Sequence, residues 1–170
     1  MSVAALAQTD KPLMVIDRPD QSNAPIIIPK GSLQIETGFM LEQDNNNPPG
    51  QTNFTYNSTL IKYGVNDFFE LRLNAGYLGM RQLQGKNPSP GFGPIAIGAK
   101  VKLADEKGFL PQAAIAGHIN LKTGAKEFTP DYTTCDISLL FSHEFNEKWS
   151  LTYNGGVKWT GETPEAIFLY

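Results

Sequence analysis

The sequence predicts an all-β protein, an antiparallel up-and-down transmembrane β-barrel. Apolar and polar side chains alternate with period two, which is typical of strands with one oily face and one polar face. The alternating runs are about 9–11 residues long, the length that a tilted strand needs to cross a bilayer, whereas a globular strand averages about 5–6. Long and short connections between the runs also alternate along the chain, as they do in outer-membrane barrels.

About seven or eight strands are predicted from this alternation. They cover residues 33–41, 53–60, 69–77, 95–103, 113–121, 135–145 and 149–159, and another begins at 166–170. In the second run, Phe54, Tyr56 and Leu60 are assigned to the apolar face, opposite Asn57 and Thr59. We divide the chain into a signal-peptide remnant at 1–8, an N-terminal periplasmic segment at 9–32, and barrel strands at 33–170 that form an incomplete barrel.

Composition excludes several classes of protein. The chain has 170 residues, a net charge of −3 and one cysteine. The mildly acidic net charge does not provide the basic surface that nucleic-acid binding requires. One cysteine permits neither an internal disulfide nor a cysteine-based zinc site. No apolar run approaches the roughly 18 residues of a membrane helix, but a membrane barrel alternates and averages to ordinary hydropathy.

The N-terminal stretch Ala5-Leu6-Ala7-Gln8 resembles the end of a signal peptide, with chance alanine enrichment as the alternative. The next notable motif comprises Asp17, Arg18, Pro19 and Asp20. Local turn chemistry is the favoured interpretation of this motif. The alternatives are that it docks inside the lumen, caps the periplasmic mouth or binds a cation.

Period-two alternation does not reveal which face points outward. In a membrane barrel the apolar face meets lipid, and in a soluble barrel it surrounds the interior. Long strands, alternating loops and polar faces rich in Gly, Ser, Thr and Asn favour lipid outside. Aromatic residues flank both the short turns and the long loops, which suits two membrane interfaces or simply the ends of a sheet core.

Seven side chains on the polar face are candidates for lining the lumen. If the barrel conducts solutes, these charges tune which solutes pass, and reversing the Arg72 charge changes ion selectivity. In the alternative, they pair with one another in a packed lumen or form a solvated face. The candidates are Glu36, Glu70, Arg72, Asn74, Lys100, Lys102 and Lys158.

Catalysis is not predicted. Ser142, His143 and Glu144 are sequence neighbours, but a strand turns adjacent side chains to opposite faces. Cys135 lies about 26 Å from His143 at roughly 3.3 Å per residue, and His118 stands alone in its strand. The sequence contains no metal-ligand spacing and no cofactor motif, so no metal and no cofactor is expected.

Three motifs resemble the outer-membrane transporter family named after the phenol meta-degradation pathway. They are Ile16–Gln21 with Pro29–Gly38, Ile61–Arg72 with its Tyr-Gly turn and Glu-Leu-Arg strand, and Gly93–Lys100. The resemblance covers residues 14–160 and implies a monomeric barrel of about 12 strands. The chain then corresponds to the N-terminal portion of a longer barrel, or to an incomplete record.

These observations predict an outer-membrane channel that passes small, apolar or aromatic molecules, with its N-terminus on the periplasmic side. Its expected partners are the lipid bilayer, the solute and the barrel-assembly machinery, without nucleic acid. Three alternatives stay open: a soluble lipocalin-like ligand-binding barrel, a structural membrane barrel with a filled lumen, and a membrane-embedded hydrolase.

Overall fold

Successive strands pair antiparallel into one sheet in the computed structural model, which describes residues 16–17, 23–44, 51–82, 89–146, 148–160 and 165–169. The described residues contain no α-helix, so none could cross a membrane as a helix. Within them the strands are β1 (Leu33–Asp44), β2 (Gln51–Asn66), β3 (Phe69–Gln82), β4 (Gly91–Phe92), β5 (Ala96–Ala104), β6 (Gln112–Asn120), β7 (Thr134–Asn146), β8 (Trp149–Trp159) and β9 (Ile167–Leu169).

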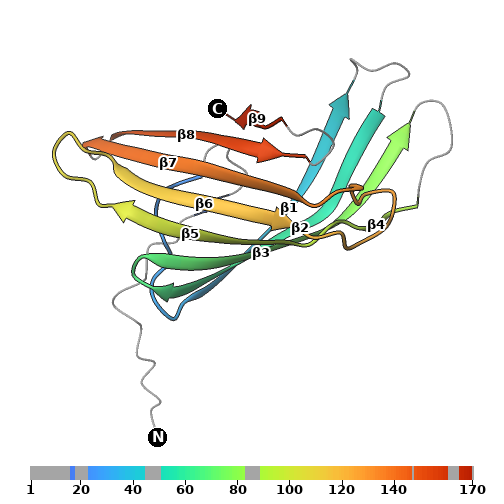
Figure 1. The fold of residues 1–170 in the computed structure, drawn as a ribbon, viewed down its shortest axis with the longest axis horizontal. Helices are drawn as coiled ribbons and strands as arrows, with labels where there is room; N and C mark the ends of the chain where they lie inside the picture. The colour runs from blue at the N-terminus through green and yellow to red at the C-terminus, as the bar shows by residue number, and fades with distance from the viewer. Residues whose placement is uncertain are drawn as a thin grey trace, which may run out of the picture.

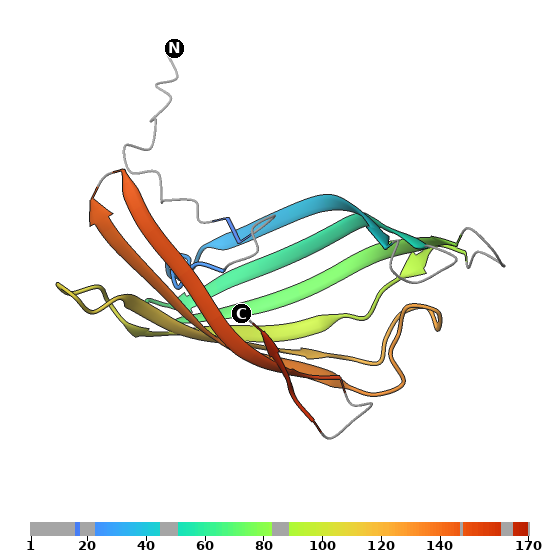
Figure 2. The ribbon, with the colours of Figure 1, turned by 90° about the horizontal axis from the view of Figure 1, so that it is seen from above.

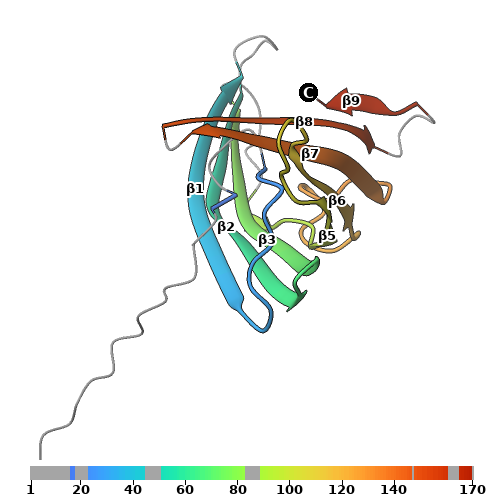
Figure 3. The same cartoon turned by 90° about the vertical axis from the view of Figure 1, so that its left-hand side faces the viewer.

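The sheet has the order β1-β2-β3-β5-β6-β7-β8-β9, and the short β4 pairs with β3 (Figure 1). Each strand therefore lies beside its sequence neighbours, which is the up-and-down arrangement that the sequence predicts. The sheet curls into a half-barrel (Figure 2). Residues 23–32 run along its concave side, between β1–β3 and the later strands (Figure 3).

Asparagine side chains close two of the short turns. The Asn66 side-chain oxygen accepts a hydrogen bond from the Phe68 amide at 3.0 Å, so β2 returns as β3 through two residues. Asn146 accepts from the amides of Lys148 and Trp149 at 2.9 and 3.1 Å. Such bonds from an asparagine to the backbone two or three residues on replace a backbone turn. The side chains of Asn66 and Asn146 therefore fix these two turns.

The convex face of the sheet is apolar and the concave face carries the buried charges. On β3, Leu71 is 45% exposed while its neighbour Glu70 is fully buried, and on β5 Ile97 is 49% exposed while Lys100 is fully buried. Buried ionisable groups are rare unless they are paired. This polarity is the reverse of what a lipocalin-like barrel requires, because the oily side chains point away from the enclosed space.

A β-bulge in β2 corrects the predicted faces of that strand. The register with β3 shifts between Thr55 and Asn57, which adds one residue to β2. Leu60 consequently lies in the interior, 4% exposed, and the side chains of Asn57 and Thr59 hydrogen-bond to each other on the exposed face. The assignment of Leu60 to the apolar outer face was wrong, because strict alternation does not survive an inserted residue.

β3 is longer than predicted. It continues to Gln82, so the connection expected at 79–92 starts later, and Gly91–Phe92 within it pairs as β4 with Tyr77 and Leu78. Seven strands of the described chain have 9 to 16 residues. These lengths meet or exceed the span that a tilted strand needs.

Gly64 marks the closest approach between β2 and the N-terminal segment. Its amide donates to the Ser32 carbonyl at 3.1 Å, and its carbonyl accepts from the Gly31 amide at 2.7 Å. A Cβ atom at Gly64 would collide with the backbone oxygens of Ile28 and Pro29. A side chain here would therefore push the segment off the sheet, since both colliding groups are backbone.

We expect Gly64→Ala to lower the free energy of unfolding by about 1–3 kcal/mol, the usual cost of overpacking. Gly38→Ala is the matched control, because a Cβ at Gly38 meets nothing within 4 Å. Urea titration of both variants, followed by tryptophan fluorescence, measures the difference. Equal stability of the two variants would contradict a tight contact at Gly64.

Candidate lumen and its ionic network

Six charged side chains meet on the concave face of the sheet. We call them the ionic network. It holds three carboxylates and three cations, so its formal charge sums to zero, and every member is at most 9% exposed. The members come from the N-terminal segment and from β1, β2, β3 and β5: Asp17, Glu36, Lys62, Glu70, Arg72 and Lys100.

Asp17 is the centre of the network. Its Oδ2 atom accepts from Arg72 Nη2 at 2.5 Å, and it lies 3.2 Å from Lys62 Nζ and 3.3 Å from Lys100 Nζ. Burial alone would raise the pKa of the Asp17 carboxyl, but the charges of Lys100, Arg72 and Lys62 outweigh burial and lower the pKa below its ordinary value of 3.8. Asp17 therefore stays ionised against three cations.

The two glutamates complete the pairing. Glu36 Oε1 lies 2.5 Å from Lys62 Nζ, and Glu36 also accepts the Asp17 backbone amide at 3.2 Å. Glu70 Oε2 accepts the Ile28 amide at 3.0 Å, and its Oε1 faces Arg72 Nε at 3.4 Å. Each carboxylate thus joins a strand cation, the N-terminal segment, or both.

The network fastens the N-terminal segment inside the half-barrel. Lys100 Nζ donates to the carbonyl oxygens of Ala24 at 2.8 Å and Ile26 at 3.4 Å. On the far wall, Asn154 bonds the backbone of Asn23 when its amide is turned so that the oxygen accepts from the Asn23 amide at 2.7 Å. The segment therefore bridges β5 and β8 across the interior.

The structure divides the seven predicted lumen residues. Four of them belong to the ionic network and pair within it, which is the packed-lumen alternative: Glu36, Glu70, Arg72 and Lys100. Lys102 pairs with exposed Asp105 at 2.8 Å beside a short turn. Asn74 and Lys158 line open hollows of the interior.

Because Arg72 is 3% exposed and paired with carboxylates, it does not present a free charge to a solute. The prediction that reversing the Arg72 charge changes selectivity is therefore replaced. We expect that charge reversal to break the network, because it replaces a cation by a carboxylate that repels Glu70 and Asp17.

Asp17 docks in the interior, so the favoured interpretation of local turn chemistry was wrong for this residue. Arg18, Pro19 and Asp20 lie outside the described residues. Sequence reasoning also missed Lys62. Lys62 is the one charged residue in 51–66. Strict alternation from Phe54 and Tyr56 assigns it to the outer face, but the bulge at Tyr56 turns the residues after it to the opposite face.

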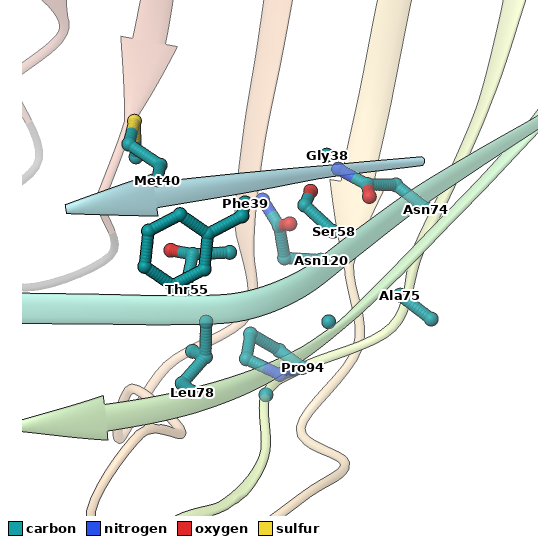
Figure 4. Close-up of a pocket in the computed structure, with 12 residues that line it drawn as sticks. Gly38, Phe39, Met40, Thr55, Ser58, Asn74, Ala75, Leu78, Pro94 and Asn120 are labelled. Atoms are coloured by element: carbon teal, nitrogen blue, oxygen red, sulfur yellow. The ribbon is translucent and has the colours of Figure 1, made fainter. Parts of the chain in front are cut away.

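Beyond the network, the interior is hollow towards the long connections. A cavity of about 470 Å³ is framed by Met40, Leu78 and Pro94 together with the polar residues Asn74 and Asn120 (Figure 4). A hollow of about 740 Å³ lies along β6–β9. It is lined by His118, Asn120, Asp136 and Lys158, by small or polar residues, and by Phe168 and Leu169 of β9. Asn120 therefore borders both spaces.

Two histidines have acidic partners from other elements. His118 stands alone in β6, and its partner comes from the neighbouring strand: its Nδ1 lies 3.0 Å from Asp136 on β7. His143 Nδ1 lies 2.7 Å from Glu106 in the β5–β6 turn. The hydrogen bond from His143, with a second from the Glu144 amide, lowers the pKa of Glu106. No group of three metal-ligating side chains occurs among residues that the structure describes.

A curled antiparallel sheet with an apolar outer face and an ionic interior defines a protein of the β-barrel class. A family model described as "Putative MetA-pathway of phenol degradation" matches residues 16–169, and the chain belongs to this family. Comparison with curated proteins found no match, and comparison with solved structures found none either.

We expect Asp17→Asn to destabilise the protein by about 3–5 kcal/mol, because it leaves three buried cations without their shared anion. Asp105→Asn is the control, since its ion pair with Lys102 is exposed and contributes about 0–1 kcal/mol. Denaturant titration of both variants tests the contrast. If Asp17→Asn is as stable as Asp105→Asn, the network does not hold the segment.

Acid should release the N-terminal segment. The unfolded chain protonates Asp17 near pH 3.8 and the folded chain only at lower pH. The Asp17 contribution is therefore fully present above pH 3.8 and is lost as pH falls through the lowered pKa. Limited proteolysis with pepsin, as pH falls from 4, should show cleavage near residues 23–30 increasing relative to an unfolded reference peptide digested at the same pH. Cleavage that does not increase relative to the reference peptide would contradict the assignment.

Proposed function

We propose that this protein forms a β-barrel in the bacterial outer membrane and that small, apolar or aromatic molecules pass through the interior of this barrel. The observation that carries the proposal is the reversed polarity of the sheet. Leucine, isoleucine and aromatic side chains cover the convex face, and the ionic network lies inside. Lipid is the environment that favours such a surface, because water would not.

The arrangement of the connections supports the same proposal. The connections after β2 and β7 have two residues each, whereas 13 residues separate β3 from β5 and β6 from β7, and outer-membrane barrels likewise have short periplasmic turns and long extracellular loops. The strict alternation predicted from the sequence does not hold throughout, because the connection after β5 has seven residues and the connection after β1 has six. Exposed aromatic side chains occur at both ends of the strands, including Trp149 and Phe145 at the short turns and Phe39 and Phe92 towards the long connections. Aromatic rings favour the membrane interfaces.

In this orientation the first residues of β1 and the segment before it lie at the periplasmic side. The barrel-assembly machinery would receive the chain there. The proposed solute path uses the hollows beyond the ionic network and needs no catalytic residue. A structural membrane barrel without transport is the second candidate, because the network and residues 23–30 fill the periplasmic half of the interior.

Adjacent residues on β7 test the membrane orientation. Ile137 is exposed on the convex face, and Ser138 lines an interior hollow. In lipid vesicles we expect Ile137→Lys to cost about 2–4 kcal/mol and Ser138→Lys much less. Folding titrations in vesicles give both values. A larger cost for Ser138→Lys would assign the apolar face to the protein interior and reject the membrane proposal.

Conductance separates transport from a structural role. In planar lipid bilayers the full chain should insert and give discrete current steps. The control is the same chain denatured by heat, which should give no steps. Stable insertion, measured by protease protection in vesicles, without current would favour the structural barrel.

A further inference from the structure

Two interior hollows lie next to each other on the long-connection side. The apolar cavity shares Pro94 and Asn120 with a neighbouring hollow of about 310 Å³, and that hollow is also lined by Lys158 and Thr160. Asn120 therefore lies at the border between the apolar cavity and the hollow that Lys158 lines.

Lys158 differs from the cations of the ionic network. Cross-strand register places it beside Asp136, which in turn pairs with His118. The Asp136 carboxylate lies 3.0 Å from His118 Nδ1. Among described residues, Lys158 has no carboxylate within 4.0 Å, whereas Lys62, Arg72 and Lys100 each contact Asp17. Its ammonium is therefore available to an incoming anion.

Small neighbours keep the space around Lys158 open. Gly155, Gly156 and Ser138 line the same hollow of about 740 Å³. At Gly156 a Cβ would collide with the Ser138 hydroxyl, so a residue without a side chain is required where β8 packs against Ser138. Asn120 adds an amide at the border, held by its hydrogen bond to Thr134 at 2.8 Å.

The opposite end of the space suits an apolar group. Met40, Leu78 and Pro94 frame the cavity of about 470 Å³, and Asn74 and Asn120 are among its polar lining residues (Figure 4). Small-molecule sites are typically apolar hollows of roughly 300–1,000 Å³ with a few polar groups that fix the orientation. This cavity and Lys158 together meet that description.

We propose that the interior holds a binding site for a small amphipathic anion, such as an aromatic carboxylate. Its apolar body lies among Met40, Leu78 and Pro94, and its anionic group reaches past Asn120 to Lys158. The inference deepens the proposed transport function and rests on it for the meaning of the site, since it names the class of solute that the lumen selects.

Binding of three matched compounds tests the proposal. Benzoate, benzyl alcohol and benzylammonium share one ring and differ in charge. Titration calorimetry of the full chain in nonionic detergent at pH 7 should show benzoate binding about tenfold more tightly than benzyl alcohol, the gain expected from one charge-assisted hydrogen bond. Benzylammonium should bind least. Equal affinity for all three compounds, or no binding of benzoate, would overturn the proposal.

Variants at the anionic end assign the preference to Lys158. Lys158→Gln should remove the tenfold preference, and Lys158→Arg should keep it. Lys148→Gln removes the same charge from the exposed turn of the same hairpin and should leave the preference unchanged. Asn120→Asp, which sets a carboxylate at the border, should also abolish it and decides the matter if Lys158→Gln does not fold. A preference that survives both Lys158→Gln and Asn120→Asp would refute the site.

The outcomes for binding and transport are distinct. Selective benzoate binding in detergent without current in bilayers would retain the site and reject transport. Current without any preference for benzoate over benzylammonium, measured as block of the channel, would retain transport and reject the site.

Discussion

Asp17 is the group on which the interior depends. One carboxylate faces Lys62, Arg72 and Lys100, each of which is at most 3% exposed. Three desolvated cations on neighbouring strands would repel one another, so β2, β3 and β5 can keep them together only while carboxylates are present. Because Asp17 precedes the first strand, the sheet and the N-terminal segment stabilise each other.

The polarity of the sheet follows from the same constraint. The charged side chains of the ionic network must lie where Asp17 and the segment can reach them, which is the concave side. Period-two alternation then sends Leu71, Leu73 and Ile97 to the convex side. The ionic interior and the lipid-compatible exterior are therefore two consequences of one register, and a slip by one residue would exchange them.

The two halves of the interior differ in what occupies them. Near the short turns, opposite charges cancel and the backbone of residues 23–30 occupies the space, so this half contributes rigidity. Towards the long connections, Met40, Leu78 and Pro94 face an open cavity, and Lys158 is free of a close carboxylate among the described residues. The proposed solute site therefore lies in the half of the interior that the network does not occupy.

The sequence by itself determined the strand order, the tight turns after β2 and β7, and the polar face of β3 and β5, because these features depend on neighbours along the chain. It also named Glu36, Glu70, Arg72 and Lys100 as interior residues. Only the tertiary structure decided that they pair around Asp17, that the bulge at Tyr56 turns Leu60 and Lys62 inward, and that Asp136 reaches His118. These contacts join residues up to 83 positions apart, and no local periodicity encodes a distance of that kind.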